Sequence, residues 1–333
     1  MKIALVSDAW LPQTNGVVRT LRETTRCLEA AGHTVAAITP IPFRTFPCPT
    51  YPEIRLAALP WRRVQRILDD FRPDAVHVAT EGPIGLAGRR WCRERGQTFT
   101  SSFHTRFPEY VRLRAPIPVA WTWRMLRWFH DAAERTLVPT RTQQEELAAR
   151  GFHSPVVWGR GVDTTLFRPE LRSALPGPGP HLMYMGRVSV EKNIEAFLRL
   201  ETPGTKWVVG GGPALDAFRQ AWPSVNFVGP KYGEDLATWL ASADVFVFPS
   251  RTDTFGIVLL EAMACGLPVA AYPVPGPRDV VCDGESGVLD DDLQRAVEAA
   301  LQLDRATCRR HALNHTWERA TEQFCAYLES ASP

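Results

Sequence analysis

Two series of alternating apolar strands and amphipathic helices run through this chain of 333 residues. The first series predicts strands at 2–6, 33–39, 74–78 and 98–103, and helices at 17–31, 64–71 and 84–95. The second predicts strands at 181–185, 206–209, 225–228 and 245–248, and helices at 194–200, 215–221 and 236–241. Near-continuous apolar strands separated by helices are typical of a parallel sheet covered on both faces. The chain is therefore predicted to be an α/β protein with two tandem, doubly wound, Rossmann-like domains.

A Pro- and Gly-rich stretch separates the two series. Residues 168–181 carry four prolines and two glycines, a composition typical of a linker. We predict domains at 1–167 and 182–312 on either side of this linker, and a C-terminal helix within 313–333 that packs back on the first domain. Two domains agree with the length, since a domain averages roughly 150 residues.

The composition excludes several classes of protein. Hydrophobic residues make up 45% of the chain and charged residues 22%, as in soluble globular proteins rather than disordered or membrane-spanning ones. Asp8 interrupts the N-terminal apolar run too early for a signal peptide. The seven cysteines include no Cys-x-x-Cys pair, so neither a disulfide framework nor a zinc site is indicated. We therefore expect a cytoplasmic protein.

Charge is distributed unevenly along the chain. Residues 1–165 hold 23 basic and 15 acidic side chains, a net charge of +8, whereas the remainder holds 15 and 21, a net charge of −6. A basic half suits an anionic surface. No nucleic-acid-binding signature accompanies the charge, so we expect no nucleic-acid partner.

The loop after the expected strand 181–185 has features of an anion-binding site. Gly186 and Arg187 follow the strand, and Lys192 lies in the expected first turn of the next helix. A cation there faces the positive end of the helix dipole, which is unfavourable by up to ~1 kcal/mol unless an anion is bound. The chain has only four lysines against 34 arginines, so a lysine rather than an arginine at this position is unusual for this chain. A surface charge paired with a neighbouring glutamate is the alternative.

Two acids eight residues apart follow the expected strand 245–248. Asp253 lies at the expected N-cap of a helix that ends before Gly266. Glu261 lies on an apolar stripe of that helix, and its burial without hydrogen-bond donors would cost several kcal/mol. On an ideal helix the two carboxylates are about 12 Å apart, comparable to the distance from ribose to hexose in a nucleotide sugar. An ordinary capped helix with Glu261 bridged by an arginine is the alternative.

These motifs together resemble the family 4 retaining glycosyltransferases of the GT-B fold. The resemblance runs from residue 2 to about residue 321 and includes the loop from Pro12 to Gly16. Residues 79–84, 104–110 and 159–168 are similar to the bacterial lipid-glycosyltransferase branch, which includes GDP-mannose-dependent α-mannosyltransferases and sulfoquinovosyltransferases. The resemblance implies two domains that face a cleft, with the acceptor in the first and the nucleotide-sugar donor in the second.

The resemblance also implies a role for each motif residue. Arg187 and Lys192 would neutralise the donor diphosphate. Glu261 would hold the ribose and Asp253 the hexose, while His104 would contact the sugar near the reacting carbon. The implied catalytic residues are His104, Arg187, Lys192 and Asp253. The implied donor-binding residues are Gly16, Gly186, Arg187, Lys192, Gly229, Lys231, Tyr232, Asp253, Thr254, Phe255, Gly256, Ile257, Val258 and Glu261.

The chain departs from the family pattern at three places. Asp253 stands where most members have glutamate, which shortens the reach to the sugar by one methylene. Gly211 replaces an aspartate that is common in the family, which weakens any inference about the base. The segment 275–279 replaces a Gly-Gly-x-x-Glu turn, so donor contacts there are open.

The implied reaction is a retaining, metal-independent front-face transfer in which the departing phosphate takes the acceptor's proton. The branch resemblance favours GDP-mannose as donor, with UDP-glucose, UDP-glucuronate or UDP-sulfoquinovose as alternatives. Residues 290–292 are three aspartates that match a metal-binding Asp-x-Asp motif, but acids before the expected helix 293–301 are typical of a helix N-terminus. We therefore predict no metal and no cofactor besides the nucleotide-sugar co-substrate.

Residues 104–130 combine five arginines with aromatic side chains, a pattern typical of an interfacial membrane helix. It predicts a lipid or lipid-linked acceptor, an anionic membrane surface as partner, and a peripheral position on the inner face of the cytoplasmic membrane. A helix with core tryptophans and solvated arginines is the alternative. The residues assigned to acceptor or membrane are Arg106, Tyr110, Arg112, Arg114, Trp121, Trp123, Arg124 and Arg127.

Two other classes of function compete with the transferase. A GT-B epimerase would need its own catalytic acids and histidine, and a non-catalytic sugar-nucleotide-binding protein would not need all the implied catalytic residues at once. We expect the chain to be a monomer or a weak dimer.

Overall fold

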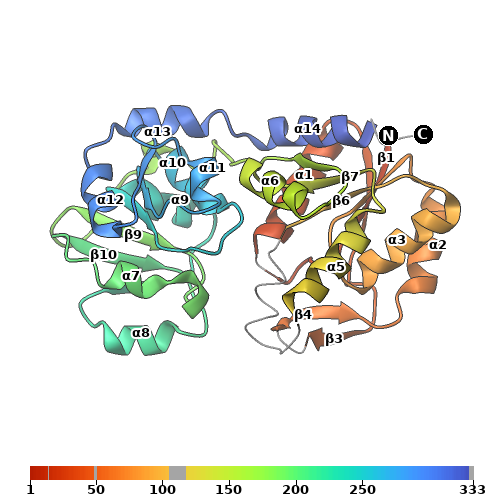
Figure 1. Ribbon diagram of the computed structural model, residues 1–333. Helices are drawn as coiled ribbons and strands as arrows, with labels where there is room; N and C mark the ends of the chain where they lie inside the picture. The colour runs from red at the N-terminus through yellow and green to blue at the C-terminus, as the bar shows by residue number, and fades with distance from the viewer. Residues whose placement is uncertain (14, 49–50, 105–117, 330–333) are drawn as a thin grey trace. The chain divides into compact units, whose positions relative to one another are not determined.

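The computed structural model describes residues 1–13, 15–48, 51–104 and 118–329, and it divides into two compact units. Unit 1 comprises Met1–Gly159 and Trp317–Pro333, and unit 2 comprises Arg160–Thr316. Each unit is built on a six-stranded parallel sheet with helices on both faces (Figure 1). The predicted α/β class with two Rossmann-like halves is confirmed.

Unit 1 has a sheet in the order β2-β1-β5-β6-β7-β8 and a separate antiparallel hairpin of β3 and β4. Its strands are β1 (Lys2–Val6), β2 (Thr34–Ile38), β3 (Thr45–Cys48), β4 (Tyr51–Ala57), β5 (Ala75–Val78), β6 (Thr100–Ser102), β7 (Arg135–Val138) and β8 (Pro155–Val157). Its helices are α1 (Gly16–Ala30), α2 (Trp61–Phe71), α3 (Pro83–Arg95), α5 (Val119–His130), α6 (Arg141–Ala149) and α14 (Trp317–Glu329).

The first strand shows why this sheet is covered on both sides. Successive side chains of a strand point to opposite faces. Ile3 and Leu5 belong to the core formed with α1 and α14, whereas Ala4 and Val6 belong to the core formed with α2 and α3. Every residue from Ile3 to Val6 is buried. An uninterrupted apolar run is therefore what this position in the sheet requires.

Unit 2 has a sheet in the order β11-β10-β9-β12-β13-β14. Its strands are β9 (His181–Met185), β10 (Thr205–Val209), β11 (Asn226–Gly229), β12 (Val245–Phe248), β13 (Val269–Ala271) and β14 (Gly287–Leu289). Its helices are α7 (Ile194–Leu198), α8 (Leu215–Ala221), α9 (Gly233–Ser242), α10 (Ile257–Ala264), α11 (Pro277–Val280), α12 (Leu293–Ala300) and α13 (Arg305–Ala312), with 3-10 turns η1 (Pro169–Leu171) and η2 (Val190–Lys192).

The segment after residue 159 belongs to unit 2, whereas residues 160–167 were expected in the first domain and residues 168–181 in a linker. The reason is local packing. Phe167 is buried in the core of unit 2, and Arg309 donates to its carbonyl at 2.6 Å. Arg172 then pairs with Asp244 at 2.6 Å, which ties the Pro/Gly-rich stretch to the start of β12.

The C-terminal helix was expected within residues 313–333, and α14 begins at Trp317. It lies in unit 1. Trp158 donates from its indole nitrogen to the carbonyl of Ala320 at 3.0 Å, and the Trp158 ring lies 4.8 Å from that of Phe324. Helix α14 therefore contributes to the core on one face of the first sheet.

Candidate active site

The order of strands in unit 2 identifies the edge of the sheet where a ligand binds. The chain proceeds from β9 to β10 on one side and later places β12 on the other side of β9. In open α/β sheets the ligand crevice lies at the carboxyl ends of the strands, at the point where the strand order reverses. The loops after β9 and β12 meet at that point. These loops carry the motifs that the sequence analysis selected.

The two loops are joined by an ion pair. Lys192 Nζ lies 2.5 Å from Asp253 Oδ1, with the two side chains 25% and 20% exposed. The side-chain amide of Asn193 donates to the carbonyl of Pro249 at 3.0 Å, which holds the loops together a second time. The implied phosphate-binding lysine and the implied hexose-binding acid are thus in direct contact.

The local structure corrects two expectations. Lys192 lies in the 3-10 turn η2, because Asn193 takes a left-handed conformation with φ of 51° and α7 begins only at Ile194. Asp253 is not the N-cap of α10, since the helix begins at Ile257 and Gly256 with φ of 81° is the residue before it. The estimate of 12 Å assumed a helix from Asp253 and therefore does not apply.

The N-terminus of α10 is available to an anion. Among the residues that the structure describes, no side chain caps it, and no acid lies in its first turn. Residues 256–258 therefore present backbone N–H groups at the positive end of the helix. One turn further on, Glu261 is only 1% exposed, as its place on the apolar stripe predicts. The burial of Glu261 was expected, whereas the helix terminus before it is not capped by Asp253.

Thr254 and Phe255 lie in the same loop, between Asp253 and Gly256. Phe255 is buried in the core of unit 2. Gly276, which sequence reasoning did not assign, packs against this loop from the segment that departs from the family pattern. A Cβ on Gly276 would lie 2.9 Å from the carbonyl oxygen of Asp253. Gly276 lies directly before the proline that begins α11, and this Gly-Pro pair was the sequence signal that could have identified the position.

Three buried polar atoms near the ion pair have no hydrogen-bond partner within the described part of the chain. They are Ser189 Oγ, Ser250 Oγ and Asp253 Oδ2, and all three lie on the loops after β9 and β12. Unpaired buried polar atoms are rare in folded proteins and require an explanation. A polar ligand at this edge of the sheet would supply one.

Glycines let the neighbouring loops of unit 2 approach closely. Gly186 follows β9, and its amide donates to the carbonyl of Val209 at 3.0 Å. Gly210 follows β10, and its amide donates to the carbonyl of Gly229 at 2.9 Å. A Cβ on Gly210 would lie 1.9 Å from the carbonyl oxygen of Gly186, so no larger residue fits there. Arg187, next to Gly186, is exposed.

The residues expected to border the base lie two strands away from β9. Gly229 ends β11, and Tyr232 is 71% exposed at the residue before α9. Lys231 pairs with Asp235 at 3.1 Å and lies 5.7 Å from the ring of Trp239. All the implied donor residues of unit 2 therefore lie along the carboxyl edge of its sheet.

At the corresponding edge of unit 1, Asp8 caps the start of α3, and sequence reasoning did not select this residue. Asp8 follows β1 and accepts hydrogen bonds from the backbone amides of Ile84 and Gly85 at 2.9 and 3.0 Å, at the start of α3. Burial raises the pKa of Asp8 above its ordinary value, although these bonds and the Thr80 hydroxyl act in the opposite direction. A Cβ on Gly82 would lie 2.4 Å from the Asp8 carboxyl carbon. The Gly-Pro pair at the start of α3, with Gly82 before the helix and Pro83 as its first residue, was the sequence signal for this cap.

Gly16 and His104 lie at the same edge of unit 1. Gly16 is the first residue of α1, which the side chain of Asn15 caps by accepting from Val18 N at 3.0 Å. His104 follows β6, and its ring lies edge-on to Trp158 with centroids 6.1 Å apart. Arg106, Tyr110, Arg112 and Arg114, which were assigned to the acceptor or membrane, lie outside the described residues.

Helix α5 has one buried and one exposed face. Trp123 is buried, stacked on Phe103 with centroids 6.0 Å apart and covered by the guanidinium of Arg150. Its predicted place at a membrane is therefore wrong, because its ring belongs to the core. Trp121 and Trp128 are instead 74% and 52% exposed.

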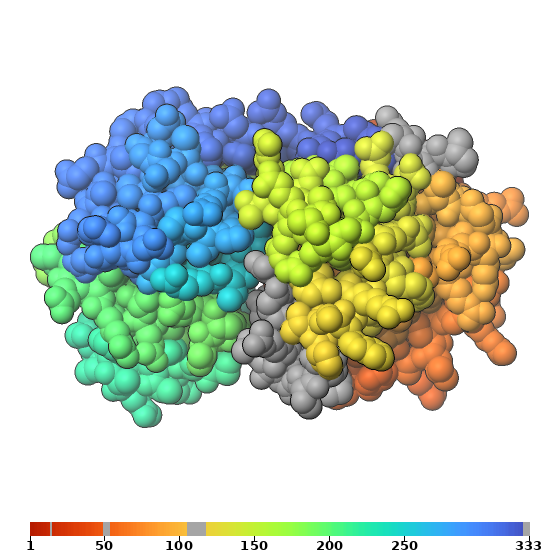
Figure 2. Space-filling model, viewed as in Figure 1, coloured from red at the N-terminus to blue at the C-terminus, as the bar shows by residue number. Residues whose placement is uncertain are grey.

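Three exposed apolar side chains of α5 form a stripe, which we call the α5 stripe: Trp121, Met125 and Trp128. Spacings of four and three residues place them on one face of the helix. Arg124 and Arg127 are exposed next to it. Figure 2 shows the α5 segment, in yellow, at the molecular surface. None of the described helices is both long and apolar enough to cross a membrane.

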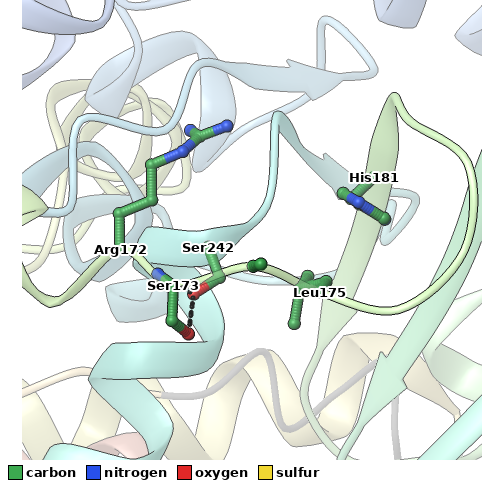
Figure 3. A pocket seen from close by; sticks show the side chains of 6 residues that line it. Arg172, Ser173, Leu175, His181 and Ser242 are labelled. Carbon is green, nitrogen blue, oxygen red and sulfur yellow. Dashed lines mark hydrogen bonds between the residues drawn. The ribbon is translucent and has the colours of Figure 1, made fainter.

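A cavity of about 400 Å³ lies elsewhere in unit 2 and belongs to the structural framework (Figure 3). It adjoins His181 at the start of β9, which is the amino edge of the sheet. The hydroxyls of Ser173 and Ser242 hydrogen-bond at 3.1 Å in its wall, and Arg172 is held by Asp244. Ligands of open α/β sheets bind at the opposite, carboxyl edge of the sheet.

Among residues 1–13, 15–48, 51–104 and 118–329, no three His, Cys, Asp or Glu side chains are grouped so that they could hold a metal ion. Asp292 of the aspartate triplet caps α12 by accepting from the amide of Gln294 at 3.0 Å. The triplet therefore has the helix-terminal place that its position before an expected helix predicted.

Comparison with known families identifies both halves of the chain. Residues 14–166 match the model of Glycosyltransferase Family 4, and residues 179–305 match that of Glycosyl transferases group 1. The GDP-mannose-dependent alpha-mannosyltransferase of Mycolicibacterium smegmatis is 31% identical over 367 residues, which covers 99% of this chain and 97% of the relative.

Solved structures share the fold over nearly the whole chain. Sucrose-phosphate synthase from Thermosynechococcus elongatus has a TM-score of 0.77 at 21% identity and covers 99% of this chain and 98% of its own. HepE from Anabaena, solved in complex with UDP-glucose, has a TM-score of 0.71 at 16% identity and covers 99% and 100%. These similarities show the fold.

Proposed function

The chain belongs to glycosyltransferase family 4, and from this membership we propose that it transfers a hexose from a nucleoside diphosphate sugar to a lipid or lipid-linked acceptor with retention of configuration. The observation that carries the proposal is the meeting of Lys192 and Asp253 at the strand-order reversal of unit 2, beside the uncapped start of α10 and the buried Glu261. This edge offers a cation and N–H groups for phosphate, and acids for sugar hydroxyls.

GDP-mannose is the donor we propose. It is supported by the full-length similarity to a GDP-mannose-dependent alpha-mannosyltransferase at 31% identity. A UDP-sugar is the second candidate, because HepE, which shares the fold, was solved with UDP-glucose. Gly211 lacks a side chain where the family commonly has aspartate, so the base would be recognised through backbone atoms and through the residues around Tyr232.

The chemistry follows from the charges along this edge. In a front-face transfer the bond from the anomeric carbon to the diphosphate breaks, and the acceptor oxygen attacks from the same side. The departing phosphate takes the acceptor's proton. Arg187, Lys192 and the N-terminus of α10 stabilise the negative charge that develops on the phosphate, which is the task a metal ion performs in other transferases. Asp253 and Glu261 accept hydrogen bonds from hexose and ribose hydroxyls.

His104 of unit 1 is proposed to contact the hexose near the reacting carbon, by its place in the family motif. Gly16, at the start of α1, is proposed to let the backbone approach the donor closely. Neither residue supplies charge to the phosphate, so their variants are expected to affect turnover more than nucleotide binding.

The α5 stripe supports a lipid acceptor. Exposed tryptophans beside arginines are the side chains that an interfacial helix presents to an anionic membrane. Trp121 is the most exposed of the stripe, while Trp128 is covered on one side by Arg89, whose guanidinium lies 3.8 Å from the ring centroid. We therefore propose peripheral binding of unit 1 to the inner face of the cytoplasmic membrane, through the exposed edge of α5.

Thermal unfolding in the presence of GDP, UDP, GDP-mannose and UDP-glucose, each with and without EDTA, tests the proposal. A ligand at 100 times its Kd adds about 2.7 kcal/mol of stability. We expect one nucleotide series to raise the Tm, with EDTA making no difference and Glu261→Ala abolishing the effect. No stabilisation by any of the four would refute a nucleotide-sugar site.

A further inference from the structure

In the candidate donor site, two residues that are proposed to bind different parts of the donor, Lys192 and Asp253, form an ion pair with each other. Asp253 accepts from Lys192 through Oδ1, and its second oxygen, Oδ2, is buried without a hydrogen-bond partner among the described residues. Both side chains are mostly buried, so water screens the pair only in part. Lys192 is therefore the main partner of the Asp253 carboxylate when no ligand is bound.

A diphosphate that draws Lys192 away leaves this carboxylate without its partner. An unpaired, mostly buried charge is unfavourable, and the cost of removing one partner exceeds the net gain from the pair itself.

An intact nucleotide sugar gives the Asp253 carboxylate new hydrogen-bond partners, whereas a free nucleoside diphosphate leaves it unpaired. Its phosphate takes Lys192, and its hexose hydroxyls donate to the carboxylate oxygens that Lys192 vacates. The free diphosphate offers the phosphate alone. The binding free energies of the two ligands therefore differ by more than the hexose contacts alone would contribute.

We propose that Asp253 is a specificity-determining residue that competes with phosphate for Lys192, so that the site binds the nucleotide sugar more tightly than its nucleoside diphosphate product. This inference rests on the proposed function. In the ligand-free protein the ion pair couples phosphate binding to hexose binding. Once the hexose has been transferred, Lys192 pairs with Asp253 again, and the nucleoside diphosphate product is bound more weakly.

Calorimetric titration of Asp253→Asn with GDP, GDP-mannose, UDP and UDP-glucose tests this. The amide has the shape of the carboxylate but no charge, so Lys192 is released to phosphate. We expect the affinity for the preferred nucleoside diphosphate to rise about tenfold, because one charge-assisted hydrogen bond corresponds to roughly that factor. The affinity for the nucleotide sugar should not rise with it. Asp253→Ala should behave in the same way, and Lys192→Ala should weaken both ligands.

Glu191→Gln is the matched control. It removes one negative charge next to Lys192, on the same turn, without breaking the pair. We expect it to change the affinities for nucleoside diphosphate and nucleotide sugar by the same small factor. If Asp253→Asn leaves the affinity for the diphosphate unchanged or lowers it, the inference is overturned while the proposed function stands. If the native protein binds none of the four ligands, the proposed function fails as well.

Discussion

Gly210 and Gly186 lie so close that a Cβ on Gly210 would be 1.9 Å from the carbonyl oxygen of Gly186. The two residues directly follow neighbouring strands of unit 2, and Gly210 has φ of 145°, a conformation that L side chains rarely adopt. The close approach brings the loops after β9 and β10 together at the carboxyl edge. This contact sets the position of Arg187, which follows Gly186 directly.

Gly210→Ala is therefore expected to destabilise the protein by about 2 kcal/mol or more, because backbone must shift against backbone. Nucleotide affinity should fall with it. Gly211→Ala is the control, since its nearest neighbour would be an ordinary contact at 3.7 Å from Pro230. Chemical denaturation measures both. Equal stability of the two variants would show that the loops are not held by this contact.

Glu261→Gln tests the buried acid of α10 with little change of shape. A hydrogen bond to a charged group contributes roughly 1.5–3 kcal/mol, so nucleotide affinity should fall by about tenfold or more. Met263→Leu, at another buried position of the same helix, conserves volume and should leave affinity unchanged. Titration of both variants with the preferred nucleotide is the measurement. Full affinity in Glu261→Gln would remove this residue from the donor site.

Asp8 should make stability depend on pH. Because its folded-state pKa is raised above the ordinary value of 3.8, the folded protein binds the Asp8 proton more tightly than the unfolded chain does. The contribution to stability is present at pH values below the unfolded pKa and is lost as pH rises through the folded pKa. Relative to Asp8→Asn, the native protein should therefore lose stability as pH increases above about 4.

Asp304 provides a control of opposite sign. Hydrogen bonds, above all from the Thr307 hydroxyl, lower the pKa of Asp304 at the start of α13. Its contribution is present above the unfolded pKa and is lost as pH falls, so the native protein should gain stability over Asp304→Asn with rising pH. Urea unfolding of the three proteins at several pH values separates the two trends. Parallel trends would contradict the assignment for Asp8.

The α5 stripe should carry membrane binding. Replacing Trp121 and Trp128 by alanine removes large exposed aromatic surface and should weaken binding to vesicles of phosphatidylglycerol and phosphatidylcholine by roughly tenfold or more. Leu313→Ala removes an exposed apolar side chain from unit 2 and should have no effect. Sedimentation with vesicles is the measurement. Equal binding of both variants would exclude the stripe as the membrane contact.

Much of the parallel-sheet framework could be predicted because buried strands are uninterrupted apolar runs. The expected strands 2–6, 181–185 and 245–248 coincide with β1, β9 and β12. The hairpin of β3 and β4 was missed, since it contains prolines and lies outside the parallel sheets. Strands of three residues, such as β13, are too short to show a pattern.

The residues of the candidate site could be selected from their positions in the sequence, but the contacts between them could not be predicted. Asp253 was placed at a helix N-cap because its residue type suits one, whereas Gly256 in a left-handed conformation delays the helix to Ile257. Its pairing with Lys192 depends on two loops that the sheet order brings together. Trp123 and Trp121 look alike in sequence, and only the packing of α5 on Phe103 distinguishes the buried ring from the exposed one.

Hexose transfer by the purified protein tests the central claim most directly. The protein is incubated with vesicles of bacterial lipid extract, EDTA, and GDP-mannose or UDP-glucose labelled in the sugar. We predict that label from one donor moves to the lipid fraction, that the matching nucleoside diphosphate is released in equal amount, and that the new linkage keeps the α configuration of the donor. Consumption of neither donor, or an inverted linkage, would contradict the account.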